Sequence, residues 1–187
     1  MLPMMHPILQ HEQIQRETAR LSRTDILTGL LNRQGFIAEL SRRMERLDRE
    51  GLPATLMVVG LDGLQAVNVR AGLEAGDAAL REAAAILRDV VRPTDLVARV
   101  GGDLFALWMD GADQFAAAER ADALRRSGFL PNGPAEPRMT VSIGLAIRSC
   151  RSFESTESLL HRGWVAMRAI KLMGGGAWKV STGEAMP

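Results

Sequence analysis

The sequence predicts a mixed α/β (α+β) fold, in which helices flank a central mixed β-sheet. Helical and extended segments alternate along the chain, which is typical of helices packed on a sheet. The run ATLMVVGLD at 54–62 is almost continuously apolar, as in a buried central strand. The strands DLVARV and LFALWM are joined at Gly101 and Gly102, and this spacing predicts a hairpin. A hairpin beside helix-linked strands requires a mixed sheet.

The first half of the chain begins with two expected helices. Residues 8–22 follow Pro7 and have sparse apolar positions, which predicts an exposed amphipathic helix. Residues 33–50 form a second, highly charged helix, and Gly51 and Pro53 end it. After the strand at 54–62, residues 76–91 place apolar side chains on one helical face.

The second half supplies the remaining strands. The hairpin is followed by a helix near 112–127 and a loop that contains three prolines, at 131, 134 and 137. A strand at 139–147, a helix at 155–173 and a closing strand at 177–181 complete the pattern. We therefore expect a linker helix at 1–22, one domain at 23–182 and a short tail at 183–187.

Composition excludes several classes of protein. The 187 residues include 47% hydrophobic ones and carry a formal net charge of +1, which is typical of one globular domain and argues against a nucleic-acid partner. The single cysteine, Cys150, cannot form an intrachain disulfide, and no apolar run is long enough to cross a membrane. We expect a cytoplasmic protein with no membrane span.

Three separated stretches carry a family resemblance. DILTGLLNRQGF (25–36), GLDGLQAVNVRAGLEAGD (60–77) and RVGGDLF (99–105) occur in this order and together resemble the GGDEF domain of bacterial diguanylate cyclases. The similarity extends over about residues 22–181. It implies a nucleotidyl-cyclase-like GGDEF fold, with its hairpin at the GGDLF turn. Members of this family bind GTP and, as homodimers, make the signalling molecule cyclic di-GMP.

The resemblance implies that part of a nucleotide site is retained. Asn68 and Asp77 match the pair that reads guanine, and Lys171 matches a phosphate-contacting lysine. A carboxylate suits the N1 and N2 donors of guanine, and an amide suits its neighbouring edge. The alternative is that Asn68 and Asp77 only cap the helices that begin and end there. GTP is therefore a possible ligand.

The catalytic half departs from the family pattern. Phosphoryl transfer in this family needs divalent metal ions held by carboxylates. The first metal-binding acid of the family is replaced by Gly60, the second is retained as Asp103, and the acid after it is replaced by Leu104. Three further polar positions have also lost their charge, and these are occupied by Gln65, Trp164 and Gly175. We therefore expect no catalytic residues, no bound metal and no cofactor.

Asp62 leaves an alternative open. Residues 60 and 62 of a strand share a face, so Asp62 and Asp103 are the residual candidates for a metal site. In that case the chain is a divergent diguanylate cyclase that uses Mg²⁺. The other interpretation is that Asp62 caps a helical segment beginning at Gly63.

The resemblance also implies a second nucleotide site, just before the hairpin. Arg92, Asp95 and Arg99 in VRPTDLVARVGG match the Arg-x-x-Asp inhibitory site at which many GGDEF domains bind cyclic di-GMP. An arginine fork can grip a guanine edge or a phosphate, and the aspartate can accept from guanine. The alternative is an inherited charge pair of small energetic value.

The preferred hypothesis is a degenerate GGDEF domain that binds cyclic di-GMP and acts as a signalling or regulatory module. Whether the dinucleotide is bound is expected to be communicated to a protein partner, or to a second copy of the chain, through the N-terminal helix. The alternatives are the divergent cyclase and a protein-interaction module that binds no nucleotide.

Overall fold

The computed structural model describes residues 23–127 and 139–183. The predicted N-terminal helix and the three-proline loop lie outside the described residues. Within the described part of the chain there are six strands and five helices.

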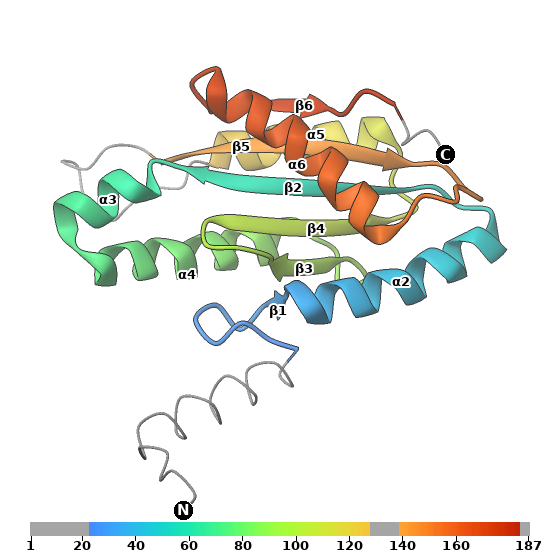
Figure 1. The fold of residues 1–187 in the computed structure, drawn as a ribbon, viewed down its shortest axis with the longest axis horizontal. Coiled ribbons are helices and arrows are strands. Elements are labelled where there is room, and N and C mark those ends of the chain that lie inside the picture. The colour runs from blue at the N-terminus through green and yellow to red at the C-terminus, as the bar shows by residue number, and fades with distance from the viewer. Residues whose placement is uncertain (1–22, 128–138, 184–187) are drawn as a thin grey trace, which may run out of the picture.

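The strands form one mixed sheet (Figure 1). They are β1 (Leu31–Asn32), β2 (Ala54–Asp62), β3 (Leu96–Arg99), β4 (Leu104–Asp110), β5 (Thr140–Arg148) and β6 (Trp178–Val180). Their spatial order is β1-β3-β4-β2-β5-β6. The pairs β1/β3 and β5/β6 are parallel, and the three central pairs are antiparallel. This arrangement confirms the predicted mixed sheet and the hairpin at the GGDLF turn.

Helices cover both faces of the sheet. They are α2 (Arg33–Glu50), α3 (Leu64–Ala71), α4 (Leu73–Val90), α5 (Gln114–Ser127) and α6 (Thr156–Leu172). Buried side chains of α2 and α6 pack on one face, and those of α4 and α5 pack on the other. Figure 1 shows α6 and α2 in front of the sheet. The fold is therefore a three-layer sandwich.

The helix predicted at 76–91 starts earlier than expected, at Leu73. It follows a separate helix, α3, which begins directly after Gly63. The interpretation of Asp62 as a helix cap required a helix at this point. Only Leu64 and Val67 of α3 are buried, which explains the weak periodic signal of this helix. The two-residue strand β1 is too short for any pattern, and its position is set by pairing with β3.

The alternation of β2 determines where the candidate site lies. Met57, Val59 and Leu61 belong to the core beneath α4 and α5. Leu56 and Val58 belong to the core beneath α2 and α6. Gly60 and Asp62 therefore face the α6 side, because successive side chains of a strand point to opposite faces. Among the described residues, no helix is both long enough and apolar enough to cross a bilayer.

Candidate functional site

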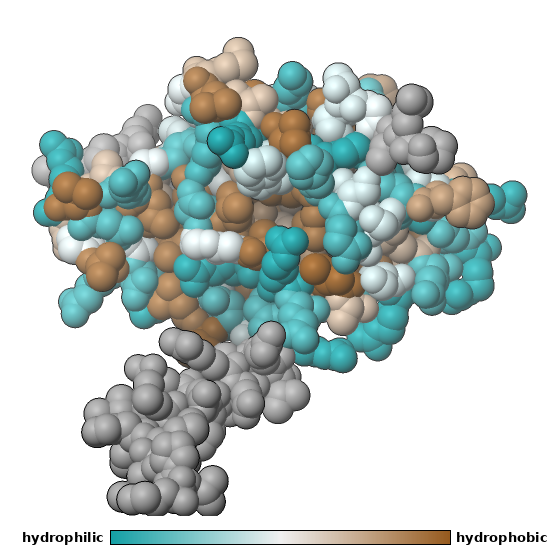
Figure 2. Space-filling model, in the orientation of Figure 1, coloured by the Kyte–Doolittle hydropathy of each residue, from teal (hydrophilic) through white to brown (hydrophobic). Residues whose placement is uncertain are grey.

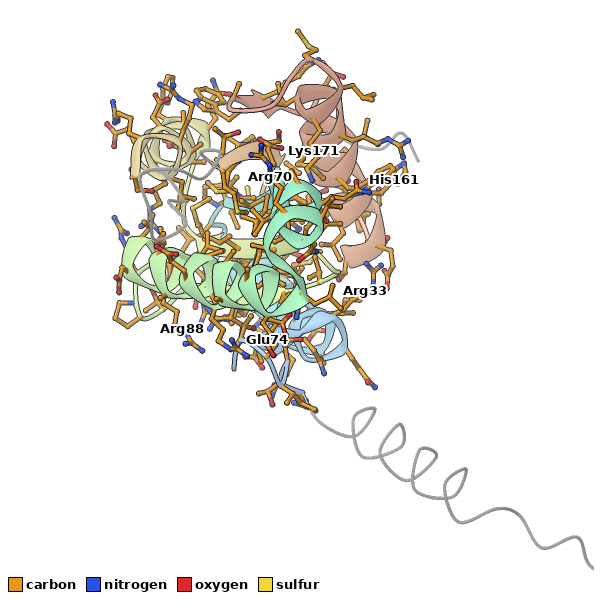
Figure 3. The ribbon with its side chains drawn as sticks, turned by 90° about the vertical axis from the view of Figure 1, so that its left-hand side faces the viewer. Arg33, Arg70, Glu74, Arg88, His161 and Lys171 are labelled. Atoms are coloured by element: carbon orange, nitrogen blue, oxygen red, sulfur yellow. The ribbon has the colours of Figure 1, made fainter. Side chains whose placement is uncertain are left out.

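The carboxyl end of β2, the hairpin tip and the end of α6 meet at a hollow of about 320 Å³. Its lining includes five of the positions singled out in the sequence: Asp62, Gln65, Asp103, Lys171 and Gly175. Figure 3 views the molecule from this end and labels Lys171 near the end of α6. The fold therefore brings these five motif positions together in one place.

Lys171 is bonded within this hollow. Its ammonium group donates to Asp103 Oδ2 at 2.5 Å and to the carbonyl oxygen of Leu61 at 3.0 Å. A Cβ atom added at Gly60 would lie 2.7 Å from Lys171 Cε and 2.8 Å from Met167 Sδ. The missing side chain at residue 60 is thus the space that Lys171 and Met167 fill.

Asp62 is held by other groups. Its carboxylate accepts from Thr140 Oγ1 and Ser142 Oγ at 2.8 Å each, and from the backbone amide of Gly176 at 3.0 Å. The residue before α3 that acts as N-cap is Gly63, and no side chain caps this helix. The interpretation of Asp62 as a helix cap is therefore wrong: Asp62 instead fastens β5 and the loop after α6.

Gly175, which stands where the family resemblance implies an arginine, packs against Asp62. Its φ is +77°, and an added Cβ would lie only 2.4 Å from Asp62 Oδ2. We expect Gly175→Ala to lower the free energy of unfolding by about 1–3 kcal/mol, because both the backbone and the contact are strained. Gly174→Ala is the matched control, since its φ is also positive, +109°, but nothing lies within 4 Å of its Cβ position. Urea denaturation of both variants measures the difference, and equal losses would argue against the Asp62 contact.

The residues at this hollow do not fit a divalent metal ion. Such ions need several carboxylate or carbonyl oxygens. Gly60 supplies no side chain, the Asp62 oxygens accept three hydrogen bonds, and Asp103 is paired with Lys171. The described part of the chain contains no group of three or more His, Cys, Asp or Glu side chains that could hold a metal.

Asn68 and Asp77 lie within helices rather than at their ends. Asn68 is in the middle of α3, and Asp77 is inside α4, whose N-cap is Gly72. The capping interpretation of this pair is therefore wrong. The Asn68 side chain lies against α4, because a Cβ added at Gly76 would be 1.8 Å from Asn68 Oδ1. Neither polar side chain is used to end a helix, so the pair remains compatible with a role in binding.

Leu104 and Trp164 occupy two positions where the resemblance implies acids, and they line one cavity. This cavity of about 620 Å³ lies between the start of α2, β4 and α6, and Val58, Val100 and Leu160 also line it. His161 stacks on Trp164 with ring centroids 6.0 Å apart, and the Arg168 guanidinium lies 5.0 Å from the Trp164 ring centroid. Figure 2 shows hydrophobic residues on this face between hydrophilic ones. Both substitutions thus make the same region apolar.

A separate hollow of about 380 Å³ lies near the start of β3. Arg88, Arg92 and Asp95 line it together with Thr24, Leu30 and other residues. Asp95 Oδ2 accepts from the Arg92 backbone amide at 3.0 Å and from Arg120 Nη1 at 2.5 Å. The structure therefore brings the predicted Arg92 and Asp95 together. The sequence motif did not identify Arg88, which lies on the last turn of α4 one turn before Arg92.

Arg99 has a different setting. Its guanidinium donates to the carbonyl oxygen of Gly102 at 2.8 and 3.1 Å and to both carboxylate oxygens of Asp25 at 3.3 Å. Although burial opposes it, hydrogen bonds from Thr28 and the charge of Arg99 lower the pKa of Asp25. Arg99 thus joins the hairpin tip to the turn at 25–29 and is not among the residues that line the Arg92 hollow.

The geometry agrees with comparisons to known proteins. The family model described as "Diguanylate cyclase, GGDEF domain" matches residues 22–176. The chain belongs to the GGDEF family. All three motif stretches of this GGDEF domain lie within the matched residues.

Relatives and solved structures show how much of the chain is shared. The chain is 28% identical over 181 residues to the probable diguanylate cyclase DgcE of Escherichia coli, covering 95% of this chain and 16% of that protein. It is 34% identical over 134 residues to the bifunctional cyclase and phosphodiesterase MucR of Pseudomonas aeruginosa, covering 71% of this chain and 20% of that protein. The GGDEF domain of DgcB from Caulobacter crescentus, solved with cyclic di-GMP, is 28% identical with a TM-score of 0.75, covering 86% of this chain and 94% of that domain. The chain thus spans a fifth or less of these two full-length relatives.

Proposed function

We propose that this GGDEF domain binds cyclic di-GMP at the hollow around Arg92 and Asp95, and that it does not synthesise the dinucleotide. The observation that supports binding most directly is the placement of Arg88, Arg92 and Asp95 around one hollow of about 380 Å³. This volume is in the range of small-molecule sites in proteins.

The charges of this hollow suit an anionic dinucleotide. Arg88 and Arg92 line the hollow together with a single carboxylate, that of Asp95, which is paired with Arg120 from outside the lining. Cyclic di-GMP carries two phosphodiester charges, and guanidinium groups bind phosphate oxygens through paired, charge-assisted hydrogen bonds. The surplus of positive charge therefore favours this ligand.

Asp95 can take part without giving up its structural contacts. Both of its hydrogen bonds within the described residues use Oδ2, from Arg92 and Arg120. The other carboxylate oxygen, Oδ1, is left to accept from the N1 and N2 donors of a guanine. The carboxylate is almost fully buried, with 2% of its side chain exposed. A guanine would therefore reach Oδ1 only after neighbouring side chains move, while Arg120 keeps its hydrogen bond to Oδ2.

The absence of synthesis is supported by the other hollow. Metal-assisted phosphoryl transfer needs oxygen ligands in fixed geometry. Gly60 and Leu104 supply none, and Lys171 is bonded to Asp103. Asn68 and Asp77 remain compatible with guanine recognition, so GTP binding without turnover belongs to the same proposal.

Complexes of relatives add support. Both the DgcB domain and a microbial GGDEF domain that is 27% identical, with a TM-score of 0.71, are described as structures with cyclic di-GMP. The relatives DgcE and MucR are much longer than this chain, so their likeness to it does not identify a partner that receives the signal. We include that partner in the proposal. A protein partner or a second copy of this chain is the expected recipient.

Calorimetric titration with cyclic di-GMP tests the proposal. We expect the wild-type chain to bind, and Arg92→Ala to weaken binding by about tenfold or more through loss of a charge-assisted contact. Arg81→Ala is the matched control, because Arg81 is an exposed arginine of α4, the helix that precedes Arg92, and does not line the hollow. Absence of heat with the wild type, or equal affinity for wild type and Arg92→Ala, would overturn the proposal.

A further inference from the structure

We infer that the ammonium group of Lys171 serves as a built-in cation, in the place where a divalent metal ion would be needed for nucleotide chemistry. The inference deepens the proposed lack of synthesis and does not depend on cyclic di-GMP binding. It assigns to Lys171 a role different from the phosphate contact that the family resemblance implies.

The groups around Lys171 Nζ are the ligands of a hard cation. They are a carboxylate oxygen of Asp103 at 2.5 Å and the backbone carbonyl oxygen of Leu61 at 3.0 Å. Carboxylate and carbonyl oxygens are the protein ligands that Mg²⁺ and Ca²⁺ prefer. In this chain both of these oxygens accept from the same ammonium group.

The Lys171 side chain itself occupies the space beside Gly60, next to the two oxygens that its ammonium group contacts. A Cβ atom at Gly60 would lie 2.7 Å from Lys171 Cε and 3.2 Å from Lys171 Nζ. A carboxylate at residue 60 and the observed Lys171 conformation therefore exclude each other. The observed position of Lys171 therefore depends on the glycine at residue 60.

The end of α6 keeps the ammonium at this point. Lys171 lies one turn after the buried Met167, which also fills the space beside Gly60. The amides of Gly174 and Gly175 close the helix on the carbonyl oxygens of Lys171 and Ile170 at 3.2 and 3.0 Å. Because the ammonium is tethered, it competes with a free metal ion at a high effective concentration.

Nuclear magnetic resonance of lysine ammonium groups tests the contact directly. The chain has only two lysines, Lys171 and the exposed Lys179 on β6, so each signal can be assigned with Lys171→Met and Lys179→Met. We expect the Lys171 ammonium protons to exchange with water more slowly than those of Lys179, and Asp103→Asn to remove this difference. Equal exchange of the two lysines in the wild-type chain would overturn the inference.

Metal binding provides the second test. Mn²⁺ is titrated into the protein and the free ion is measured by electron paramagnetic resonance. We expect no site-specific binding by the wild type or by Lys179→Met. The double variant Gly60→Asp/Lys171→Met frees Asp103 and adds a carboxylate, so we expect it to bind Mn²⁺ at one specific site that the wild type lacks.

Specific Mn²⁺ binding by the wild-type chain that Asp103→Asn abolishes would contradict the inference. If the double variant does not fold, the proton-exchange measurement on the wild type and Lys179→Met still tests whether the Lys171 ammonium is held in place. A negative cyclic di-GMP titration would refute the proposed function and leave these results unchanged, so the two failures are distinguishable.

Discussion

Replacing Asp48 with alanine is expected to lower the free energy of unfolding by about 2–4 kcal/mol. Arg148, at the end of β5, is 1% exposed and donates to both carboxylate oxygens of Asp48 at 2.9 and 2.8 Å. Removing the carboxylate leaves a buried guanidinium without its counterion. We place the loss below the maximum for a buried pair because the Asp48 side chain is 33% exposed, so water can replace part of the contact.

Asp89→Ala is the matched control, because Asp89 is an exposed aspartate on α4. We expect it to change the free energy of unfolding by no more than about 0.5 kcal/mol. Guanidinium chloride denaturation of the three proteins measures both values. Equal stability of Asp48→Ala and the wild type would show that the Arg148 pair does not hold α2 to the end of β5.

The same pair makes stability depend on pH. The hydrogen bonds from Arg148, with the backbone amide of Arg151 and the Arg148 charge, lower the pKa of Asp48 despite its partial burial. A carboxyl group whose pKa is lower in the folded state stabilises the fold above its unfolded pKa, near 4. This contribution is lost as the pH falls below that value. Denaturation midpoints of wild type and Asp48→Ala are therefore expected to converge in acid, and a constant difference down to pH 3 would contradict the assignment.

The hydrophobic pattern of the sequence predicts much of the fold. The continuous apolar run at 54–62 predicts the central strand with its bounds, and Gly51 predicts the end of α2, where it adopts a φ of +68°. The helix α3 is poorly predicted from the sequence, because a helix with only two buried residues gives little periodic hydrophobic signal. The two-residue strand β1 depends on its partner β3, and no local pattern can specify such a contact.

The candidate site could be predicted in part. The motif positions 62, 103, 171 and 175 line one hollow, and the family resemblance had grouped them as parts of one nucleotide motif. What could not be predicted is how they are bonded. The hydrogen bonds from Thr140 and Ser142 to Asp62 join strands β5 and β2. These two residues lie 78 and 80 positions after Asp62 in the sequence. The position of Lys171 depends on the space at Gly60, which is visible only when α6 is packed on the sheet.

The hollow around Arg92 and Asp95 shows a similar limit. The spacing of Arg92 and Asp95 identified two of its residues. Arg120 lies 25 residues beyond Asp95, on α5, and Arg88 precedes the motif on α4. Nothing in the sequence distinguishes either arginine from others on surface helices. Only the packing of α5 and α4 beside the start of β3 brings Arg120 into contact with Asp95 and Arg88 into the same hollow.

Incubation of the purified chain with GTP and Mg²⁺ or Mn²⁺, followed by chromatographic measurement of cyclic di-GMP, tests the central claim most directly. Loss of a single essential electrostatic group costs about 10²–10³ in rate, and the family resemblance implies that several such groups are replaced here. We therefore expect no cyclic di-GMP above background, while an active diguanylate cyclase under the same conditions produces it. Sustained production of cyclic di-GMP that Asp103→Asn abolishes would contradict the account.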